Sequence, residues 1–457
     1  MTGGLPAGWA ETTLERAGTW RSGGTPSRRR PDFFGKGIPW VKSGDLPDGP
    51  ILRTAEELTK EGLANSTSKL LPPGTISMAL YGATIGKLGT MTFPAATNQA
   101  CANVIPDGQL IEASYLFYYL LAERQRFIEQ GQGGAQPNIS QEIVRNHPLR
   151  LPPLPEQRRI VAKLEKLLGK VDACKERLAK IPVLLKRFRQ AVLAAACSGK
   201  LTADWRGEAP PNSLLPLEPP NPGDMINVEE IVDAPGSWRW IPLQAVCDPG
   251  RSICYGVIKL GAETPNGIPC LRTSNVKPLA IDTTNVKRIA VAISDEYRRT
   301  LLRGGELLVN VRGTLGGVAV VPPDMHGWNV SREVAVVPVQ GVLPRFIALW
   351  IASVPCQDWL TGAAKGVAYT GINIADLKLL PVVIPSLAEQ SEIVRRVDAL
   401  FAVADQIQTR FERAREQVEK LTPALLGRAF RGELVPQDPN DEPASALLAR
   451  IRAKRNL

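Results

Sequence analysis

Apolar residues recur along two stretches of this chain at alternating steps of four and three residues. The first stretch comprises Ile160, Leu164, Leu167, Val171, Cys174, Leu178, Ile181, Leu185, Phe188 and Val192. The second comprises Ile393, Val397, Leu400, Ala404, Ile407, Phe411, Ala414, Val418, Leu421 and Leu425. This spacing is typical of the a and d positions of a coiled-coil helix.

A single helix with such a seam could equally pack on its own domain. Two matched seams in one chain favour pairing with each other, as an antiparallel coiled coil. We expect the pairing contacts to come from Ile160, Leu164, Leu167, Val171, Leu178, Ile393, Val397, Leu400, Ile407 and Phe411.

The chain is a tandem repeat. Glu156-Gln157 matches Glu389-Gln390 at an offset of 233 residues (389 minus 156), and six further residues match at the same offset. Upstream the match is looser, because Gly37-Ile38-Pro39 meets Gly267-Ile268-Pro269 at an offset of 230 (267 minus 37). Small insertions in loops explain why the offset between the two copies changes along the chain. Each copy is a globular domain followed by a helix.

Two prolines interrupt the helical stretches at different places. Proline lacks a backbone donor and clashes with the preceding turn. Pro182 and Pro423 therefore predict a main helix of roughly residues 155–180 in the first copy and 388–421 in the second, each followed by a shorter helix. About 26 residues at 1.5 Å per residue would form a rod of roughly 40 Å.

The globular halves predict mixed domains with a strand-rich part. Residues 75–80 and 306–311 are short runs of β-forming residues, and each leads into a glycine-punctuated turn and a second run, as in a hairpin. Residues 115–129 and 344–360 each predict one amphipathic helix. The expected fold class is α+β, with two tandem mixed α/β domains, each followed by a long helix, and the two helices paired with pseudo-twofold symmetry.

These features divide the chain into six segments. Six of the eighteen residues from 207 to 224 are proline, which favours a stiff, extended linker. The segments are a first domain at 1–152, a first helical region at 153–206, a proline-rich linker at 207–228, a second domain at 229–385, a second helical region at 386–435 and a tail with a short helix at 436–457.

Composition narrows the class of protein. The 457 residues are 44% hydrophobic, enough for two or more cores, and no apolar run approaches the roughly 20 residues that span a bilayer. With no signal pattern at the start, we expect a cytoplasmic protein without a membrane partner. The seven cysteines and two histidines show no metal-ligand spacing, so we expect no bound cofactor or metal. A net charge of +10 favours a polyanionic partner.

Enzyme motifs are not supported. Residues 82–88 superficially resemble a phosphate-binding loop, but three residues separate the glycines where four are needed, and Leu88 stands where a Ser or Thr belongs. Neither a dinucleotide-binding glycine pattern nor a His-Glu-x-x-His motif occurs. We therefore expect a protein that is not an enzyme.

The loops between the shared scaffold residues are polar and differ between the copies. Arg and Lys can bond guanine edges, Asn and Gln can pair with adenine, and Ser and Thr can hold phosphates; the plainer interpretation of each residue is a solvated turn. The first copy offers Arg28, Arg29, Arg30, Lys42, Ser43, Tyr81, Thr84, Lys87, Asn98, Gln99, Gln136 and Asn138. The second offers Arg272, Thr273, Ser274, Asn275, Arg312, Thr314, Ser331, Arg332, Tyr369 and Thr370.

Three segments carry a family resemblance. Residues 151–161 (LPPLPEQRRIV), 196–206 (ACSGKLTADWR) and 429–438 (AFRGELVPQD) are similar to the conserved regions of type I restriction-modification specificity subunits. The similarity covers nearly the whole chain, twice over. It implies two target recognition domains that each read one half of a bipartite, asymmetric double-stranded DNA site, with the paired helices setting the spacer between the halves.

The resemblance also implies partners. Two methylation subunits would dock on the chain and supply S-adenosylmethionine chemistry, and restriction subunits would supply ATP with magnesium. The alternative is a coiled-coil adaptor that binds protein without reading DNA, which would expose large apolar patches in place of polar loops. The helical regions differ in charge: residues 156–206 hold thirteen basic and five acidic residues, whereas residues 389–434 hold eight of each.

Overall fold

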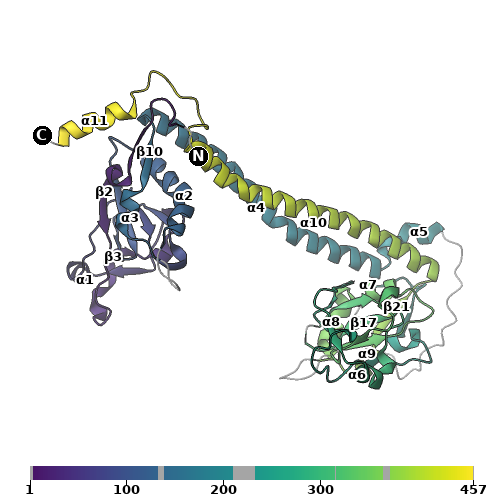
Figure 1. Ribbon diagram of the computed structural model, residues 1–457. Coiled ribbons are helices and arrows are strands. Elements are labelled where there is room, and N and C mark those ends of the chain that lie inside the picture. The colour runs from purple at the N-terminus through teal and green to yellow at the C-terminus, as the bar shows by residue number, and fades with distance from the viewer. Residues whose placement is uncertain (1–3, 132–137, 209–231, 314, 364–370, 456–457) are drawn as a thin grey trace. The chain divides into compact units, whose positions relative to one another are not determined.

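The computed structural model of the chain describes residues 4–131, 138–208, 232–313, 315–363 and 371–455 (Figure 1). The described chain forms two compact units. Unit 1 combines residues 1–179 with 413–457, and unit 2 consists of residues 180–412. Each unit therefore contains one globular domain together with a part of both long helices.

Unit 1 is built around mixed sheets. Its strands are β1 (Ala10–Thr13), β2 (Gly18–Ser22), β3 (Phe34–Val41), β4 (Gly49–Ile51), β5 (Glu56–Leu58), β6 (Ile76–Ala79), β7 (Leu88–Met91), β8 (Ala96–Thr97), β9 (Cys101–Pro106) and β10 (Pro148–Leu151). Its shorter helices are α1 (Lys60–Ala64), α2 (Ala113–Glu129), α3 (Gln141–Asn146) and, near the C-terminus, α11 (Ala444–Arg455).

The sheets of unit 1 follow the predicted hairpin. A five-stranded sheet has the order β2-β9-β6-β7-β4, and its central strand β6 is buried along its whole length. A second sheet has the order β5-β3-β8, and β1 pairs with β10. Helix α2 buries residues spaced by three and four, among them Leu116 and Leu120, so it packs on the core as its amphipathic pattern predicts.

Unit 2 repeats this arrangement. Its strands are β11 (Arg239–Pro242), β12 (Cys254–Tyr255), β13 (Ile268–Leu271), β14 (Val276–Lys277), β15 (Ala280–Ile281), β16 (Lys287–Ile289), β17 (Leu307–Asn310), β18 (Val318–Val320), β19 (Asn329–Val330), β20 (Val334–Val337) and β21 (Pro381–Ile384). Its shorter helices are α5 (Ala203–Glu208), α6 (Val291–Glu296), α7 (Pro344–Ile351), α8 (Val354–Ala363) and α9 (Ile374–Lys378).

The sheet orders of the two units correspond, except that the large sheet has five strands in unit 1 and four in unit 2, where β14 and β15 pair separately. In unit 2 the orders are β12-β20-β17-β18 and β16-β13-β19, and β11 pairs with β21. In both units the three-stranded sheet contains one antiparallel and one parallel neighbour, β3 with β5 and β8, and β13 with β16 and β19. The duplication inferred from the sequence is therefore also a duplication of fold.

The long helices run through both prolines, which corrects the predicted interruptions. Helix α4 spans Leu154–Cys197 with Pro182 inside it, and α10 spans Leu387–Ala429 with Pro423 inside it. A proline inside a helix costs about 3 kcal/mol. Burial of apolar residues beyond each proline offsets that cost: Leu193 follows Pro182 into the core of unit 2, and Leu426 follows Pro423 into the core of unit 1. Both helices are therefore longer than the predicted rod of about 26 residues.

The two helices pack against each other within each unit (Figure 1). In unit 1, the first turns of α4 share a core with the last turns of α10, and in unit 2 the last turns of α4 share a core with the first turns of α10. The start of each helix thus packs beside the end of the other, so the pairing is antiparallel as predicted. An ion pair of 2.6 Å between Arg189 and Asp405 adds a contact in unit 2.

Most of the predicted seam is buried. The fully buried positions are Ile160, Leu164, Val171, Ile393, Val397 and Phe411, and the partly buried ones are Leu167, Leu178 and Leu400. Ile407 is the exception among these contacts, at 43% exposed, and the seam positions Cys174, Phe188 and Leu421 are exposed as well. The heptad pattern therefore identifies the face on which the helices pair, although the Ile407 side chain on that face is exposed to solvent.

The second predicted amphipathic helix is divided in two. Residues 344–360, predicted as one helix, form α7 and α8. A continuous helix would need a backbone hydrogen bond donated by residue 355, and Pro355 has no N–H group to donate it. Within the described ranges, no helix is both long and apolar enough to cross a membrane.

Candidate nucleic-acid interface

The glycine-rich turn that follows the central strand is held in the same way in both units. In unit 1 the Ile139 amide donates to the Leu80 carbonyl at 2.9 Å, and Tyr81 forms a bridge with Asn138. In unit 2 the Ile372 amide donates to the Val311 carbonyl at 2.8 Å, and Arg312 forms a bridge with Gly371. The backbone of the turn is thus fixed while its side chains differ, which suits a surface that reads different ligands on one scaffold.

The side chains at this turn are accessible. Tyr81 is 45% exposed, and the Thr84 hydroxyl donates to the Tyr81 carbonyl at 2.8 Å. Lys87 is partly buried, and Asn138 is exposed. In unit 2 the exposed Arg312 guanidinium lies 5.6 Å from the centre of the Tyr255 ring, a cation–π contact that orients it.

A second group of candidates gathers around one carboxylate in unit 1. Arg28 Nη1 lies 2.7 Å from Glu56 Oε2, and Lys42 Nζ lies 2.5 Å from Glu56 Oε1. Glu56 was not among the residues predicted from the sequence. An acid in a short strand carries no signal by itself, and only the pairing of β3 with β5 brings it beside Lys42.

The remaining candidates of unit 1 are spread over the surface. Arg29 is exposed, Arg30 is exposed and paired with Asp32 at 2.6 Å, and Ser43 is partly buried at the start of a short 3-10 helix. Two others belong to one loop: Asn98 accepts a bond from the Cys101 thiol at 3.3 Å, and the exposed Gln99 bonds to Thr25. Gln136 lies outside the described residues.

The candidates of unit 2 include a turn that matches one in unit 1. The Arg272 amide donates to Asn275 Oδ1 at 3.0 Å, just as the Lys42 amide donates to Asp45 Oδ2 at 3.0 Å. Asn275 is only 2% exposed, and its amide nitrogen donates to the carbonyls of Asp282 and Thr284. Its side chain is therefore committed to holding the turn.

Exposure separates the other candidates of unit 2. Ser274 is exposed, Thr273 is partly buried, and Arg332 is exposed beside Glu333 at 3.1 Å. Ser331, by contrast, is 1% exposed. Ser331 and Asn275 thus differ from the predicted surface role, because a base edge cannot reach a buried side chain. Thr314, Tyr369 and Thr370 lie outside the described residues.

The repeated Glu-Gln pairs lie at the start of the long helices and are buried there. Gln157 Oε1 accepts a bond from the Glu112 amide at 2.8 Å, and its nitrogen donates to the Pro152 carbonyl at 3.0 Å. Gln390 repeats this with the Leu343 amide at 2.8 Å and the Pro385 carbonyl at 2.9 Å. Each glutamine therefore ties its helix to its globular domain.

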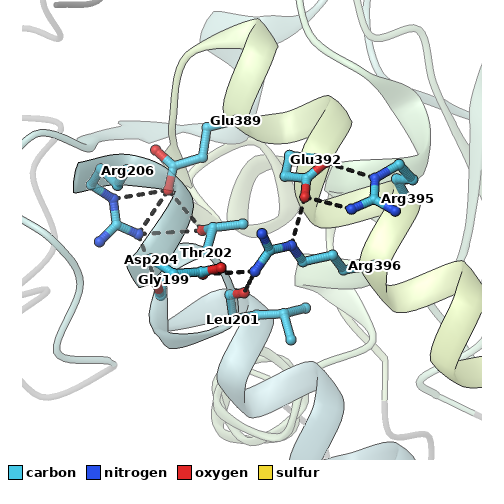
Figure 2. Close-up of polar contacts among 9 residues, drawn as sticks. All are labelled: Gly199, Leu201, Thr202, Asp204, Arg206, Glu389, Glu392, Arg395 and Arg396. Atoms are coloured by element: carbon cyan, nitrogen blue, oxygen red, sulfur yellow. Dashed lines mark hydrogen bonds and ion pairs between the residues drawn. The ribbon is translucent and has the colours of Figure 1, made fainter. Parts of the chain in front are cut away.

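The glutamate of unit 2 sits in a charged network (Figure 2). Glu389 Oε1 accepts bonds from the Thr202 hydroxyl at 2.8 Å and from Arg206 Nε and Nη2 at 2.9 and 2.7 Å. Its other oxygen accepts from the Trp238 indole at 3.0 Å. We call these residues the Glu389 joint, because they fix the segment after α4 to the start of α10.

A second ion-pair group flanks the Glu389 joint (Figure 2). Arg396 lies 2.7 Å from Asp204 and 2.6 Å from Glu392, and it donates to the Leu201 carbonyl at 2.8 Å. Hydrogen bonds from Arg395 and Arg396 lower the pKa of Glu392 to about 2. This glutamate is therefore an ionised partner at neutral pH.

The corresponding glutamate of unit 1, Glu156, accepts hydrogen bonds from uncharged side chains. Glu156 Oε1 accepts from the Trp9 indole at 3.1 Å and from the Gln437 amide at 3.2 Å, and its Oε2 is buried without a partner among the described residues. Burial raises the pKa of Glu156, and the hydrogen bonds from Trp9 and Gln437 offset this only in part. We call this group the Glu156 joint.

The chain is similar in sequence to known proteins. It matches the family model described as the type I restriction modification DNA specificity domain over residues 6–183 and 263–414. The type I restriction enzyme EcoBI specificity subunit of Escherichia coli is 35% identical over 333 residues, which cover 70% of this chain and 66% of that protein. The EcoKI specificity subunit of Escherichia coli strain K12 is 27% identical over 478 residues, covering 99% of this chain and 97% of that one.

A solved structure supports the same fold. A chain from a structure concerning complex assembly and conformational transition of the type I R-M system aligns with a TM-score of 0.69 at 20% identity, covering 94% of this chain and 99% of that one. At this identity the likeness establishes the fold. The family model covers more than half of the chain, so the chain belongs to the family of type I restriction-modification specificity subunits, and the resemblance found in its sequence is confirmed.

Proposed function

We propose that the two globular domains each read one half of a bipartite, asymmetric site on double-stranded DNA. The observation that carries this proposal is that the two units share the backbone bonds of the central turn and, apart from one additional strand in unit 1, the order of their main sheets, while the exposed side chains at the turn differ. Tyr81 and Thr84 stand in one turn, and Arg312 stands in the other. A common scaffold with different base-contacting groups gives two different half-sites.

The paired helices set the number of unread base pairs between the half-sites in this proposal. Their antiparallel seam packs inside each unit, and the buried glutamines tie each helix to a globular domain. Two methylation subunits dock on the chain, and restriction subunits join through them.

The chemistry belongs to the partner subunits. Burial raises the pKa of Cys101, Cys197 and Cys270 to about 12, so these three thiols are protonated at neutral pH. S-adenosylmethionine serves the methylation subunits, and ATP with magnesium serves the restriction subunits. This chain determines which DNA sequence the complex binds.

Binding to split duplexes tests the proposal. Sequencing methylated adenines in the host genome gives the site, and the chain with its methylation subunits is then titrated with duplexes in which one half-site or the spacer is scrambled. Scrambling a half-site should cost far more affinity than scrambling the spacer, with a strong inverse dependence on salt. Equal sensitivity in the spacer would contradict half-site reading and favour the adaptor alternative.

A single residue sharpens the test. Arg312→Ala should cost about 1–3 kcal/mol of discrimination at the second half-site and leave the first unchanged. Arg298→Ala is the matched control, because Arg298 is an exposed arginine of the same unit, paired with its neighbour Asp295 at 3.3 Å. If both variants alter DNA binding alike, Arg312 contributes only charge.

A further inference from the structure

A carboxylate, that of Glu56, lies between two of the candidate DNA-binding cations of the first domain. Glu56 accepts bonds from Arg28 at 2.7 Å and from Lys42 at 2.5 Å, one on each oxygen. All three side chains remain partly accessible to solvent, with 55%, 31% and 30% of the Arg28, Lys42 and Glu56 side chains exposed. A ligand that approaches either cation therefore also meets the carboxylate.

The cluster is preorganised by aromatic residues. The Arg28 guanidinium lies 4.3 Å from the centre of the Phe34 ring and 5.2 Å from that of Trp40. Trp40 is buried, and it stands opposite Glu56 in the pairing of β3 with β5. The hydrogen bonds from Arg28 and Lys42 lower the pKa of Glu56 to about 2, so the carboxylate is charged at neutral pH.

The second domain carries the opposite charge at the same place. Trp40 and Cys270 are equivalent, because each follows the Gly-Ile-Pro segment of its domain. Strand pairing sets Glu56 opposite Trp40 in the first domain and Lys287 opposite Cys270 in the second. Arg272 occupies the position of Lys42 in the matching turn. Within the described ranges it has no carboxylate partner, and its Nη2 donates to the Asn285 carbonyl at 3.0 Å.

We propose that Glu56 is a positioning residue for half-site recognition by the first domain: it holds Arg28 and Lys42 for neutral base edges and keeps them from binding phosphates. This inference rests on the proposed function. A phosphate must compete with the carboxylate for both cations and is repelled by its charge. A guanine edge offers neutral O6 and N7 acceptors, which the remaining donors of Arg28 and Lys42 can reach without displacing Glu56.

Glu56→Gln in the full chain with its methylation subunits tests this role. Freeing two cations should strengthen binding to a duplex without the site, and the slope of log K against log salt should steepen by about 1–2. Discrimination at the first half-site should fall roughly tenfold, as expected when one good base contact is lost. Discrimination at the second half-site should not change.

A matched control lies on the same strand. Glu57 is the next residue, and it accepts a bond from the Gly37 amide at 2.7 Å that a glutamine oxygen can also accept. Glu57→Gln removes the same charge and should leave discrimination at the first half-site intact. If it lowers that discrimination as much as Glu56→Gln does, the role assigned to Glu56 is wrong.

The outcomes distinguish failure of the role assigned to Glu56 from failure of the proposed function. If Glu56→Gln weakens binding to every duplex alike, Glu56 is only structural and the inference is overturned. If the unmodified complex discriminates half-sites and Glu56→Gln leaves that discrimination unchanged, the inference fails while the proposed function stands. If the unmodified complex shows no half-site preference, the proposed function itself fails.

Discussion

The Glu389 joint and the Glu156 joint make equivalent contacts in the two units, but the side chain that donates to the glutamate is charged in one and neutral in the other. In both, a glutamate that is 1% exposed at the start of a long helix accepts a bond from a tryptophan indole near the start of its domain. In both, a side chain donates to that glutamate and to a glycine carbonyl: Arg206 bonds Gly199 at 2.7 Å, and Gln437 bonds Gly432 at 2.7 Å. The charge of that side chain is the main difference.

The glycines show how closely the two joints are matched. Gly199 has φ 69°, and an added Cβ would lie 2.5 Å from Pro235; Gly432 has φ 76°, and an added Cβ would lie 2.4 Å from Pro6. A left-handed conformation pressed against a proline ring allows only glycine. The backbone geometry is thus common to both joints, and a buried carboxylate has a cationic partner in one and a neutral partner in the other.

The two joints differ in how the desolvation of a buried carboxylate is offset. A buried charge needs a counter-charge and hydrogen bonds to offset its desolvation. Glu389 has Arg206 for this purpose. Glu156 has a neutral amide and one unpartnered oxygen among the described residues, although Arg159 and Asp441 form an ion pair of 2.6 Å nearby. The two joints should therefore respond differently to the same substitution.

The largest effect is expected from Glu389→Ala. It leaves the Arg206 cation, the Trp238 indole and the Thr202 hydroxyl without their acceptor, which should cost unit 2 about 2–4 kcal/mol. Hydrogen exchange in denaturant should show loss of protection around Trp238 and unchanged protection around Trp9. Equal loss in both units would mean that the joint does not stabilise unit 2 specifically.

Glutamine substitutions compare the joints directly. At neutral pH, Glu389→Gln should destabilise unit 2 by about 1–2 kcal/mol, because Arg206 loses its counter-charge. Glu156→Gln should be neutral or stabilise unit 1 by up to about 1 kcal/mol, since it removes a buried charge and retains an acceptor for Trp9. Unit-resolved hydrogen exchange measures both. The reverse order of effects would break the comparison.

Gln437→Arg should make the Glu156 joint resemble the Glu389 joint. A guanidinium in reach of Glu156 should stabilise unit 1 by about 1 kcal/mol, the size of a charge-assisted hydrogen bond less its ordering cost. A double-mutant cycle with Glu156→Gln provides the control, because the gain should vanish when the carboxylate is absent. A gain that persists would show that the arginine acts elsewhere.

The smallest effect concerns pH. Burial raises the folded-state pKa of Glu156 above its ordinary 4.5, so the folded chain binds this proton more tightly than the unfolded chain does. The stability that this group contributes is present below pH 4.5 and is lost as pH rises through the folded pKa. The stability of the wild type relative to Glu156→Gln should therefore fall with rising pH above 4.5. A difference that rises with pH would show that the carboxylate is stabilised in its charged form.

Much of this architecture was predictable because its causes are local. Steps of four and three residues mark one face of a helix, so most of the buried seam could be identified in advance; the exposed exceptions are Cys174, Phe188, Ile407 and Leu421. The hairpin of β6 and β7 followed from an apolar run and a glycine turn in the same way. Prediction failed at Pro182 and Pro423, since the local cost of proline was outweighed by burial of residues further along each helix.

The candidate interface was predictable only in part. The sequence identified polar loops, and most of the described candidates are exposed or partly exposed, but it could not show that Asn275 and Ser331 turn inward. It also missed Glu56, whose role depends on two residues brought close by strand pairing. Burial and cross-strand contacts are properties of segments far apart in the chain.

By itself the sequence determined the duplication, the helical seams, the Glu-Gln pairs and the family, because each is a pattern of residue types at fixed spacing. Only the tertiary structure decided that each compact unit draws on both long helices, that Arg206 and Gln437 occupy equivalent places, and that Glu56 faces two cations where Lys287 stands in the second domain. The physical reason is that hydrogen bonds and ion pairs act over a few ångströms in space, whatever the separation along the chain.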